Sequence, residues 1–312
     1  MALGSTVDSV AVTWSERALP RYERPHEALL PELCADCIPY QEAGAAIAAS
    51  PLSDGSQILL AALLRLGTAR VFPGGGVGIE YASLLKTAAR PDALAAHAAE
   101  AAAHLHAQQA DVLFVPGMSG YPVAAMYALA SGLPAIFLKK GKVHPADGHA
   151  GYPPGSFVIP SYTGEGDVVM HVDEDAAQDI VDGIVAPQLA AQRDAARPVL
   201  TLRAAGADDI IDKATMSLAV GDSAVVVGCA AIRDFVRRHR HTTGDDRPIA
   251  ERVAVVGWVT PLIKGYNAPQ ARLERAFGLR PFAGINITGV HLHPPAIGVD
   301  GVGTLAFAPR VP

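Results

Sequence analysis

The chain has 312 residues and a mass of 32.4 kDa, and 50% of its residues are hydrophobic while 18% are charged. This composition excludes general disorder and allows a large buried core. A net charge of −6 argues against a general nucleic-acid binder, and no polybasic segment suggests attachment to a membrane surface. The longest uncharged apolar runs, such as residues 58–64, are far shorter than the roughly 18 residues of a membrane span.

Three cysteines are too few for a disulfide framework, and the first residues lack the basic start and apolar stretch of a secretory signal. We therefore expect a cytoplasmic protein. Cys34 and Cys37 have zinc-knuckle spacing, but a closed zinc site needs two further ligands, so we interpret them as packed cysteines. We interpret His291 and His293 as residues of a strand.

Prolines interrupt the first 55 residues, which we interpret as an arm or hood lying on a core that extends over residues 56–312. Periodicity and caps then predict helices over residues 54–66, 91–108, 122–131, 176–193 and 231–240. They predict strands over residues 7–14, 69–72, 111–115, 135–138, 224–229 and 253–259, and a hairpin of 156–162 with 167–173.

One βαβ unit is especially clear. Residues 111–115 are continuously apolar, as is typical of a buried parallel strand, and a glycine turn and a helix connect them to the apolar residues 135–138. The chain has only six lysines beside nineteen arginines, and Lys139, Lys140 and Lys142 directly follow this second strand. A lysine cluster is usually a solvated face, but its place at the carboxyl end of a strand favours a functional site.

In this order the segments resemble the type I phosphoribosyltransferases, and most closely orotate phosphoribosyltransferase. The resemblance covers about half of the chain. Residues 66–81 resemble the family's base-site loop, residues 115–122 its pyrophosphate loop and residues 137–144 its catalytic loop, with one residue deleted and Lys139 in place of an arginine. Residues 255–263, 271–278 and 281–287 follow the family's last strand, helix and final strand.

The resemblance implies a mainly parallel sheet flanked by helices, with an N-terminal hood. It also implies transfer of ribose 5-phosphate from phosphoribosyl pyrophosphate to a small planar heterocycle or acid. The departure of the donor motif from the family pattern suggests specialised metabolism. The only implied cofactor is Mg²⁺ with the donor, without nicotinamide or flavin, and the protein is expected to be a homodimer that binds neither nucleic acid nor membrane. The site residues that the resemblance implies are Lys139, Lys140, Lys142 and His144 for catalysis, Gly117, Met118, Ser119 and Gly120 for pyrophosphate, and Phe72, Gly74, Gly75 and Tyr81 for the base.

The chemistry agrees with these roles. Departing pyrophosphate gathers negative charge, which fixed N–H donors and cations stabilise. A glycine turn that opens a helix offers such donors, and lysines on a mobile loop can close over the leaving group while His144 donates to it.

The family's most diagnostic element has no intact copy. It is a strand that ends in two acids, which hold the ribose hydroxyls directly or through magnesium, followed by a Thr/Gly-rich loop that binds the 5′-phosphate and opens a helix. Spacing points to residues 224–234, which contain only Asp234, whereas residues 176–222 read as an inserted helical segment. The acids that remain as candidates for ribose or donor binding are Asp173, Glu174, Asp208 and Asp209.

Three hypotheses stay open. The protein is a transferase with remodelled sugar-phosphate recognition, an enzyme of the same fold that acts on another nucleotide, phosphate ester or glycoside, or a catalytically retired effector-binding protein. Residues 73–80 also resemble the glycine motif of lysine-decarboxylase-like nucleotide phosphoribohydrolases, but the order of the other segments fits orotate phosphoribosyltransferase better. If the chain is an active transferase, at least one of the four candidate acids must lie beside Gly117–Gly120.

Overall fold

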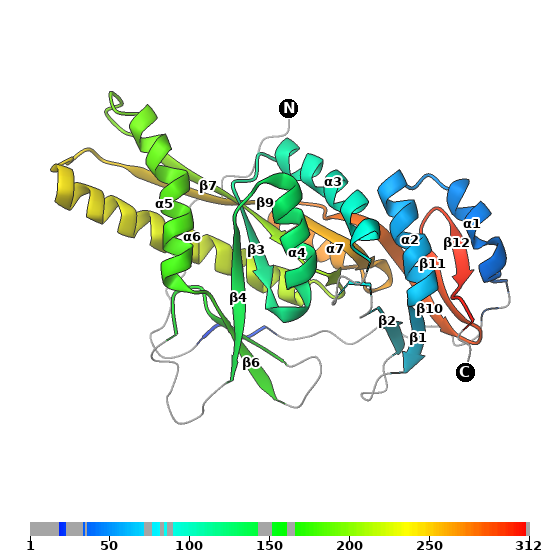
Figure 1. Cartoon of the computed structure of the whole chain (residues 1–312). Helices are drawn as coiled ribbons and strands as arrows, with labels where there is room; N and C mark the ends of the chain where they lie inside the picture. The colour runs from blue at the N-terminus through cyan, green and yellow to red at the C-terminus, as the bar shows by residue number, and fades with distance from the viewer. Residues whose placement is uncertain are drawn as a thin grey trace.

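The computed structural model describes residues 19–22, 34, 36–71, 77–81, 84–85, 90–142, 152–160 and 166–309, with the side chain of Lys142 left out. The predicted strand at residues 7–14 lies outside the described residues, and the division of the chain at residue 55 stays a prediction. The described residues form one large mixed sheet flanked by helices, with a small hairpin at one side (Figure 1).

The large sheet has the strand order β12-β11-β10-β9-β7-β3-β4-β6-β5, with β8 paired beside β9. Its central strands are parallel: β10 (Phe282–Leu292), β9 (Ala250–Lys264), β7 (Val199–Ala207), β3 (Val112–Pro116) and β4 (Ala135–Lys142), and β8 (Ile210–Ile211) is parallel to β9. The edges are antiparallel: β11 (Pro295–Val299) and β12 (Gly303–Ala306) at one side, β6 (Asp167–His171) and β5 (Phe157–Pro160) at the other. The small hairpin pairs β1 (Thr68–Val71) with β2 (Val77–Glu80).

Helices cover both faces of the sheet. One core cluster joins α2 (Asp54–Leu66), α3 (Pro91–Ala107) and α4 (Gly117–Ser131) to the sheet, and α1 (Tyr40–Ala48) packs on α2 and β12. The other cluster joins α5 (Glu174–Ala191), α6 (Thr215–Thr243) and α7 (Pro269–Phe277) to the opposite face. In β3 the alternation of side chains puts Leu113 and Val115 in the first cluster and Phe114 in the second, which explains why this strand is apolar throughout.

The chain leaves the middle of the sheet in two opposite directions. From β3 it passes through α4 to β4, and from the neighbouring β7 it passes through α6 to β9 on the other side. Because α4 and α6 lie on opposite faces, the carboxyl ends of β3 and β7 border a topological switch point. In open α/β sheets, ligands bind outside the carboxyl ends of the strands at such a point.

The mainly parallel sheet flanked by helices is confirmed, as are the helices predicted over 54–66, 91–108 and 176–193 and the hairpin that became β5 and β6. The strand predicted over residues 224–229 is wrong, since these residues belong to α6. Their β-branched run resembles a strand, but burial falls on Val220, Ala224, Val227 and Ala231, which is the spacing of one helix face. The segment at 176–222, which we expected to be helical, contains most of α5 but also the central strand β7, and its being an insertion stays a prediction.

Helix α6 is also the one helix in the described residues that is long and apolar enough to cross a membrane by length and composition. However, 61% of its most apolar window is buried within the fold. Its apolar character is therefore explained by packing between α5, β7 and β9.

Candidate active site at the switch point

An acid pair stands at the carboxyl end of β7. Asp208 and Asp209 directly follow the strand, and the Asp208 amide donates to the Val259 carbonyl of β9 (3.2 Å), which fixes the start of the turn. The pair lies against the first turn of α4, because a Cβ atom on Gly120 would be only 3.1 Å from Asp208 Oδ1. The absence of a side chain at Gly120 is thus what lets the acid pair approach the helix.

Both acids are buried, Asp208 with 8% and Asp209 with 3% of its surface exposed. The Asp209 amide donates to Asp208 Oδ1 (2.8 Å). Burial, and then the charge of Asp209, raise the pKa of the Asp208 carboxyl well above its usual range. Burial followed by the charges of both acids raises the pKa of the Tyr127 hydroxyl, which lies in the core below them. Two adjacent buried carboxylates repel each other when both are charged, which favours a shared proton or a bound cation at the pair.

Two helices begin at this same edge of the sheet, after the neighbouring parallel strands β3 and β7. Helix α4 begins at Gly117, whose φ of +52° is favourable for glycine, and α6 begins at Thr215 after Ala214, whose φ is +57°. Neither helix has a side-chain cap or an acidic residue in its first turn. Their first backbone N–H groups and the positive ends of their dipoles are therefore suited to bind an anion.

The pyrophosphate turn differs in one respect from the prediction. We expected a loop before a helix that starts at Pro122, but the helix starts at Gly117, and Gly120 is inside its first turns. Met118 is 72% exposed and Ser119 is half-buried. The Tyr121 hydroxyl donates to the Leu138 carbonyl (2.6 Å), which ties the start of α4 to the end of β4.

A second polar group follows the acid pair. Lys264, the last residue of β9, is buried, and its Nζ lies 3.2 Å from Asp212 Oδ2. Asn267 Nδ2 donates to Asp212 Oδ1 (2.7 Å). The sequence analysis did not select Lys264, Asp212 or Asn267 as site residues. Lys264 was a usable signal, because it is one of only six lysines and directly follows a long, mostly apolar stretch. A buried, paired lysine beside a turn places a donor and an acceptor next to the acid pair.

Arg272 of α7 supports the turn that opens α6. Its Nη1 donates to the Lys213 carbonyl and contacts Thr215 Oγ1 (3.4 Å). Burial and then Arg275 lower the pKa of this guanidinium, which still leaves it charged at neutral pH. In the described part of the chain no carboxylate forms an ion pair with Arg272, so its positive charge adds to that of the helix end.

The lysine cluster lies on a strand. Residues 139–142 form the end of β4 and pair with residues 168–171 of β6, so the expectation of a loop at these three lysines is wrong. Lys139 Nζ lies 2.6 Å from Asp173 Oδ2, and Asp173 also caps α5 by accepting from the Ala176 amide (3.3 Å). This hydrogen-bonded pair raises the pKa of Lys139 and lowers that of Asp173. Both side chains are exposed, so the pair adds little to stability.

The structure thus divides the candidate acids. Asp208 and Asp209 lie beside Gly120, as the transferase hypothesis requires, whereas Asp173 and Glu174 belong to the start of α5, with Asp173 paired to Lys139. Lys140 is exposed on β4, and Tyr81 packs against the core that contains α2, α3 and α4. The side chain of Lys142 and residues His144, Phe72, Gly74 and Gly75 lie outside the described residues.

The described residues contain no group of three or more His, Cys, Asp and Glu side chains arranged to hold a metal ion. Mg²⁺ needs fewer, because it takes oxygen ligands, keeps several waters and is commonly held by one or two carboxylates together with substrate phosphates. The two buried carboxylates of Asp208 and Asp209 fit this donor set and would hold the ion, whose charge would offset their repulsion.

No protein-family model and no curated protein matches the sequence. Among solved structures, the chain is similar to the APRTase of Giardia lamblia, complexed with 9-deazaadenine, with 13% identity over 72% of this chain and 96% of that one and a TM-score of 0.44. The adenine phosphoribosyltransferase of Trypanosoma brucei, in complex with AMP, pyrophosphate and ribose-5-phosphate, matches with 13% identity over 75% and 80% and a TM-score of 0.41. The orotate phosphoribosyltransferase of Aeropyrum pernix matches with 14% identity over 69% and 84% and a TM-score of 0.33. All three solved structures are phosphoribosyltransferases.

Proposed function

We propose that the protein is an enzyme of the phosphoribosyltransferase type, which joins a small planar heterocycle or acid to ribose 5-phosphate and releases pyrophosphate. The observation that carries the proposal is the contact between the acid pair after β7 and the glycine turn that begins α4, at the switch point of the sheet. A phosphorylated sugar needs acceptors for its hydroxyls and donors for its phosphates within one small space, and this contact brings both kinds of group together.

Each part of the site has a role in this proposal. Asp208 and Asp209 bind the ribose hydroxyls, directly or with Mg²⁺, which supplies charge neutralisation to the donor when bound. The N–H groups of Gly117–Gly120 hold the pyrophosphate, and the turn that opens α6, supported by Arg272, holds the 5′-phosphate. Fixed donors of this kind stabilise the negative charge that develops on the leaving group.

The turn at residues 212–215 replaces the glycine-rich loop that the sequence lacks. Ala214 adopts the left-handed conformation that such a turn requires, at a cost of about 1 kcal/mol relative to glycine. Lys264 and Asp212 offer a donor and an acceptor to the edge of a planar acceptor molecule. Because alanine, and not glycine, occupies this left-handed position, the motif is hard to recognise from the sequence.

Binding and turnover test the proposal. We expect phosphoribosyl pyrophosphate to bind in the presence of Mg²⁺ by titration calorimetry, and pyrophosphate to be released when a panel of nucleobases and aromatic acids is added. Asp209→Asn should weaken donor binding about 10-fold or more, because it removes a charged partner of the donor. Glu174→Gln, which changes an exposed acid of α5, is the matched control and should bind like the wild type. A wild-type protein that neither binds the donor nor releases pyrophosphate would refute the proposal.

The second candidate is a retired enzyme that binds an effector. Two observations favour it: Lys139 is paired with Asp173, and the turn before α6 lacks glycine. This hypothesis predicts donor or nucleotide binding without release of pyrophosphate from any acceptor, so the same two measurements separate the candidates.

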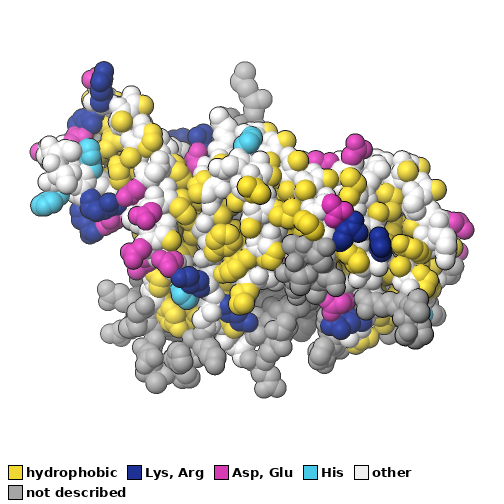
Figure 2. Space-filling view, in the orientation of Figure 1, with side chains coloured by type: hydrophobic (Ala, Val, Ile, Leu, Met, Phe, Trp, Pro, Cys, Tyr) yellow, Lys and Arg dark blue, Asp and Glu magenta, His cyan; other side chains and the backbone are white. Residues whose placement is uncertain are grey.

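We also propose a homodimer, and the surface of α4 supports it. The helix has no charged residue, and on its outer side Met118 is 72% and Leu129 is 86% exposed. Hydrophobic side chains form a band over this part of the molecule in Figure 2. A helix that is apolar on its exposed face is typical of a buried interface.

A further inference from the structure

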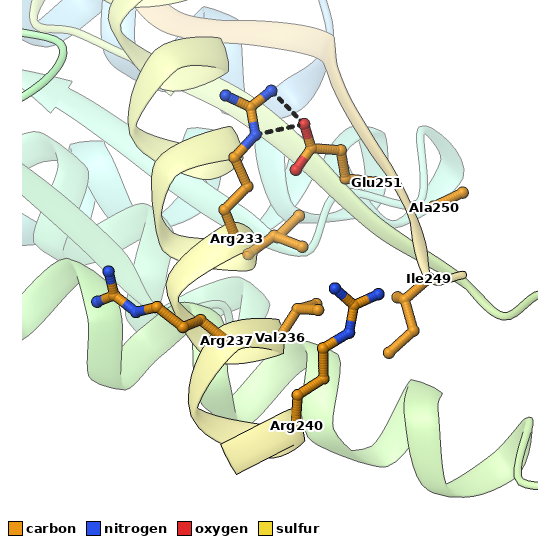
Figure 3. Close-up of a pocket in the computed structure, with 8 residues that line it drawn as sticks. Arg233, Val236, Arg237, Arg240, Ile249, Ala250 and Glu251 are labelled. Carbon is orange, nitrogen blue, oxygen red and sulfur yellow. Dashed lines mark hydrogen bonds and ion pairs between the residues drawn. The ribbon is translucent and has the colours of Figure 1, made fainter. Parts of the chain in front are cut away.

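A groove lies at the far end of the sheet from the acid pair. An open groove of about 620 Å³ runs between the C-terminal half of α6 and the start of β9 (Figure 3). Helix α6 begins at Thr215, a few residues after the acid pair, and lines the groove with residues up to Arg240. At 1.5 Å per residue, these two points are about 38 Å apart, so the groove is separate from the switch-point site.

The floor of the groove is apolar. Ile232 is fully buried, while Val236 and Ile249 are half-buried and line the groove from the helix and from the start of the strand. An aliphatic or aromatic group placed there would cover apolar surface that the fold leaves partly in water. This surface stabilises a bound molecule in proportion to the apolar area removed from water.

The rim is positively charged, with three arginines against one glutamate. Arg233 is bound through Nε to Glu251 Oε1 (2.7 Å), and Arg237 pairs with Asp234, so both of these charges are offset. Figure 3 shows Arg237 turned away from the strand.

Arg240 differs from the other two arginines. Its Nη2 donates to the Arg247 carbonyl (3.0 Å), and within the described residues no carboxylate forms an ion pair with it. Its guanidinium points across the groove toward Ile249 in Figure 3.

We propose that this groove binds a small organic anion with an apolar body, whose carboxylate, sulfonate or phosphate pairs with Arg240 while its body covers Val236 and Ile249 above the buried Ile232. The volume is within the range of about 300–1,000 Å³ that is usual for small-molecule sites. Arginine presents several donors in one plane, which suits an anionic group with two or three oxygens. The apolar floor of the groove selects the body of the ligand, and Arg240 at its rim selects the negative charge.

A matched pair of fluorescent probes tests the proposal. 8-Anilinonaphthalene-1-sulfonate has an aromatic body and an anionic group, whereas N-phenyl-1-naphthylamine has the same body without the charge. We expect the sulfonate to bind the native protein with one site and at least about 10-fold more tightly than the neutral probe, since a charge-assisted hydrogen bond contributes about this factor.

Variants locate the binding. Arg240→Gln should reduce sulfonate affinity about 10-fold and leave the neutral probe unchanged. Arg280→Gln, which removes an exposed arginine paired with Glu274, is the control and should bind both probes like the wild type. Val236→Asp should abolish sulfonate binding by placing a carboxylate in the groove, and far-ultraviolet circular dichroism checks that each variant is folded. Equal affinity for the two probes, or unchanged sulfonate binding in folded Arg240→Gln and Val236→Asp, would overturn the proposal.

Discussion

Acid should destabilise this protein through one buried histidine. His97 of α3 is fully buried, its Nε2 lies 3.1 Å from the Thr260 carbonyl of β9, and its ring stacks on Phe282 with 5.6 Å between the ring centres. Burial lowers the pKa of His97 from 6.5 to about 4, although the charge of Glu100 and the Thr260 carbonyl act in the opposite direction. The folded protein therefore keeps this imidazole neutral at pH values where the unfolded chain protonates it.

The sign and size of the effect follow from proton linkage. Since the folded pKa is the lower one, the stabilisation is complete above pH 6.5 and is lost as the pH falls toward 4. Between pH 7.5 and pH 4.5, the unfolded state gains almost a full proton at this site that the folded state does not bind. The free energy of unfolding should therefore fall by about 2.5 kcal/mol from His97 alone.

Urea unfolding at pH 7.5, 6.0 and 4.5 measures this loss. His97→Gln keeps a side-chain N–H donor near Thr260 but does not titrate, so its free energy of unfolding should fall on acidification by about 2.5 kcal/mol less than that of the wild type. His241→Gln removes an exposed histidine at the end of α6 and should behave like the wild type. If wild type and His97→Gln lose the same stability between pH 7.5 and 4.5, the reasoning from burial is wrong.

Three further predictions concern the end of β4, the core and the surface. Lys142→Ala should lower turnover about 10²–10³-fold, which is the usual effect of losing one donor to a developing anion, while the melting temperature stays nearly constant. If the variant turns over as fast as the wild type, the lysines are only solvated residues of the strand. Gly206→Ala should destabilise the fold by about 1–3 kcal/mol or more in urea unfolding, because its Cβ would lie 1.8 Å from the buried ring of Trp258, and an unchanged midpoint would contradict this packing. Sedimentation should show a dimer at micromolar concentration, and Leu129→Asp should dissociate it without unfolding the protein; a monomeric wild type would refute the homodimer.

The sequence by itself determined the elements whose signals are local. The helix over residues 54–66 was predicted to its ends, because Ser53 caps it by accepting from the Ser56 amide (3.3 Å) and Gly67 follows its last turn. The apolar strand before Gly117 and the hairpin of β5 and β6 were equally clear. Caps, turns and periodicity act within one or two turns of chain, so the letters around each position contain the necessary information.

The tertiary structure decided which segments meet. The β-branched residues 225–227 fit a strand or a helix, and packing of one face of α6 against β7 and β9 selected the helix. That choice moved the central strand to β7 and put Asp208 and Asp209, rather than residues 224–234, beside Gly120. Likewise, Lys264 became a buried partner of Asp212 only because the carboxyl ends of β8 and β9 are neighbours. Strand order depends on contacts between residues that are far apart in the chain, and no local pattern contains that information.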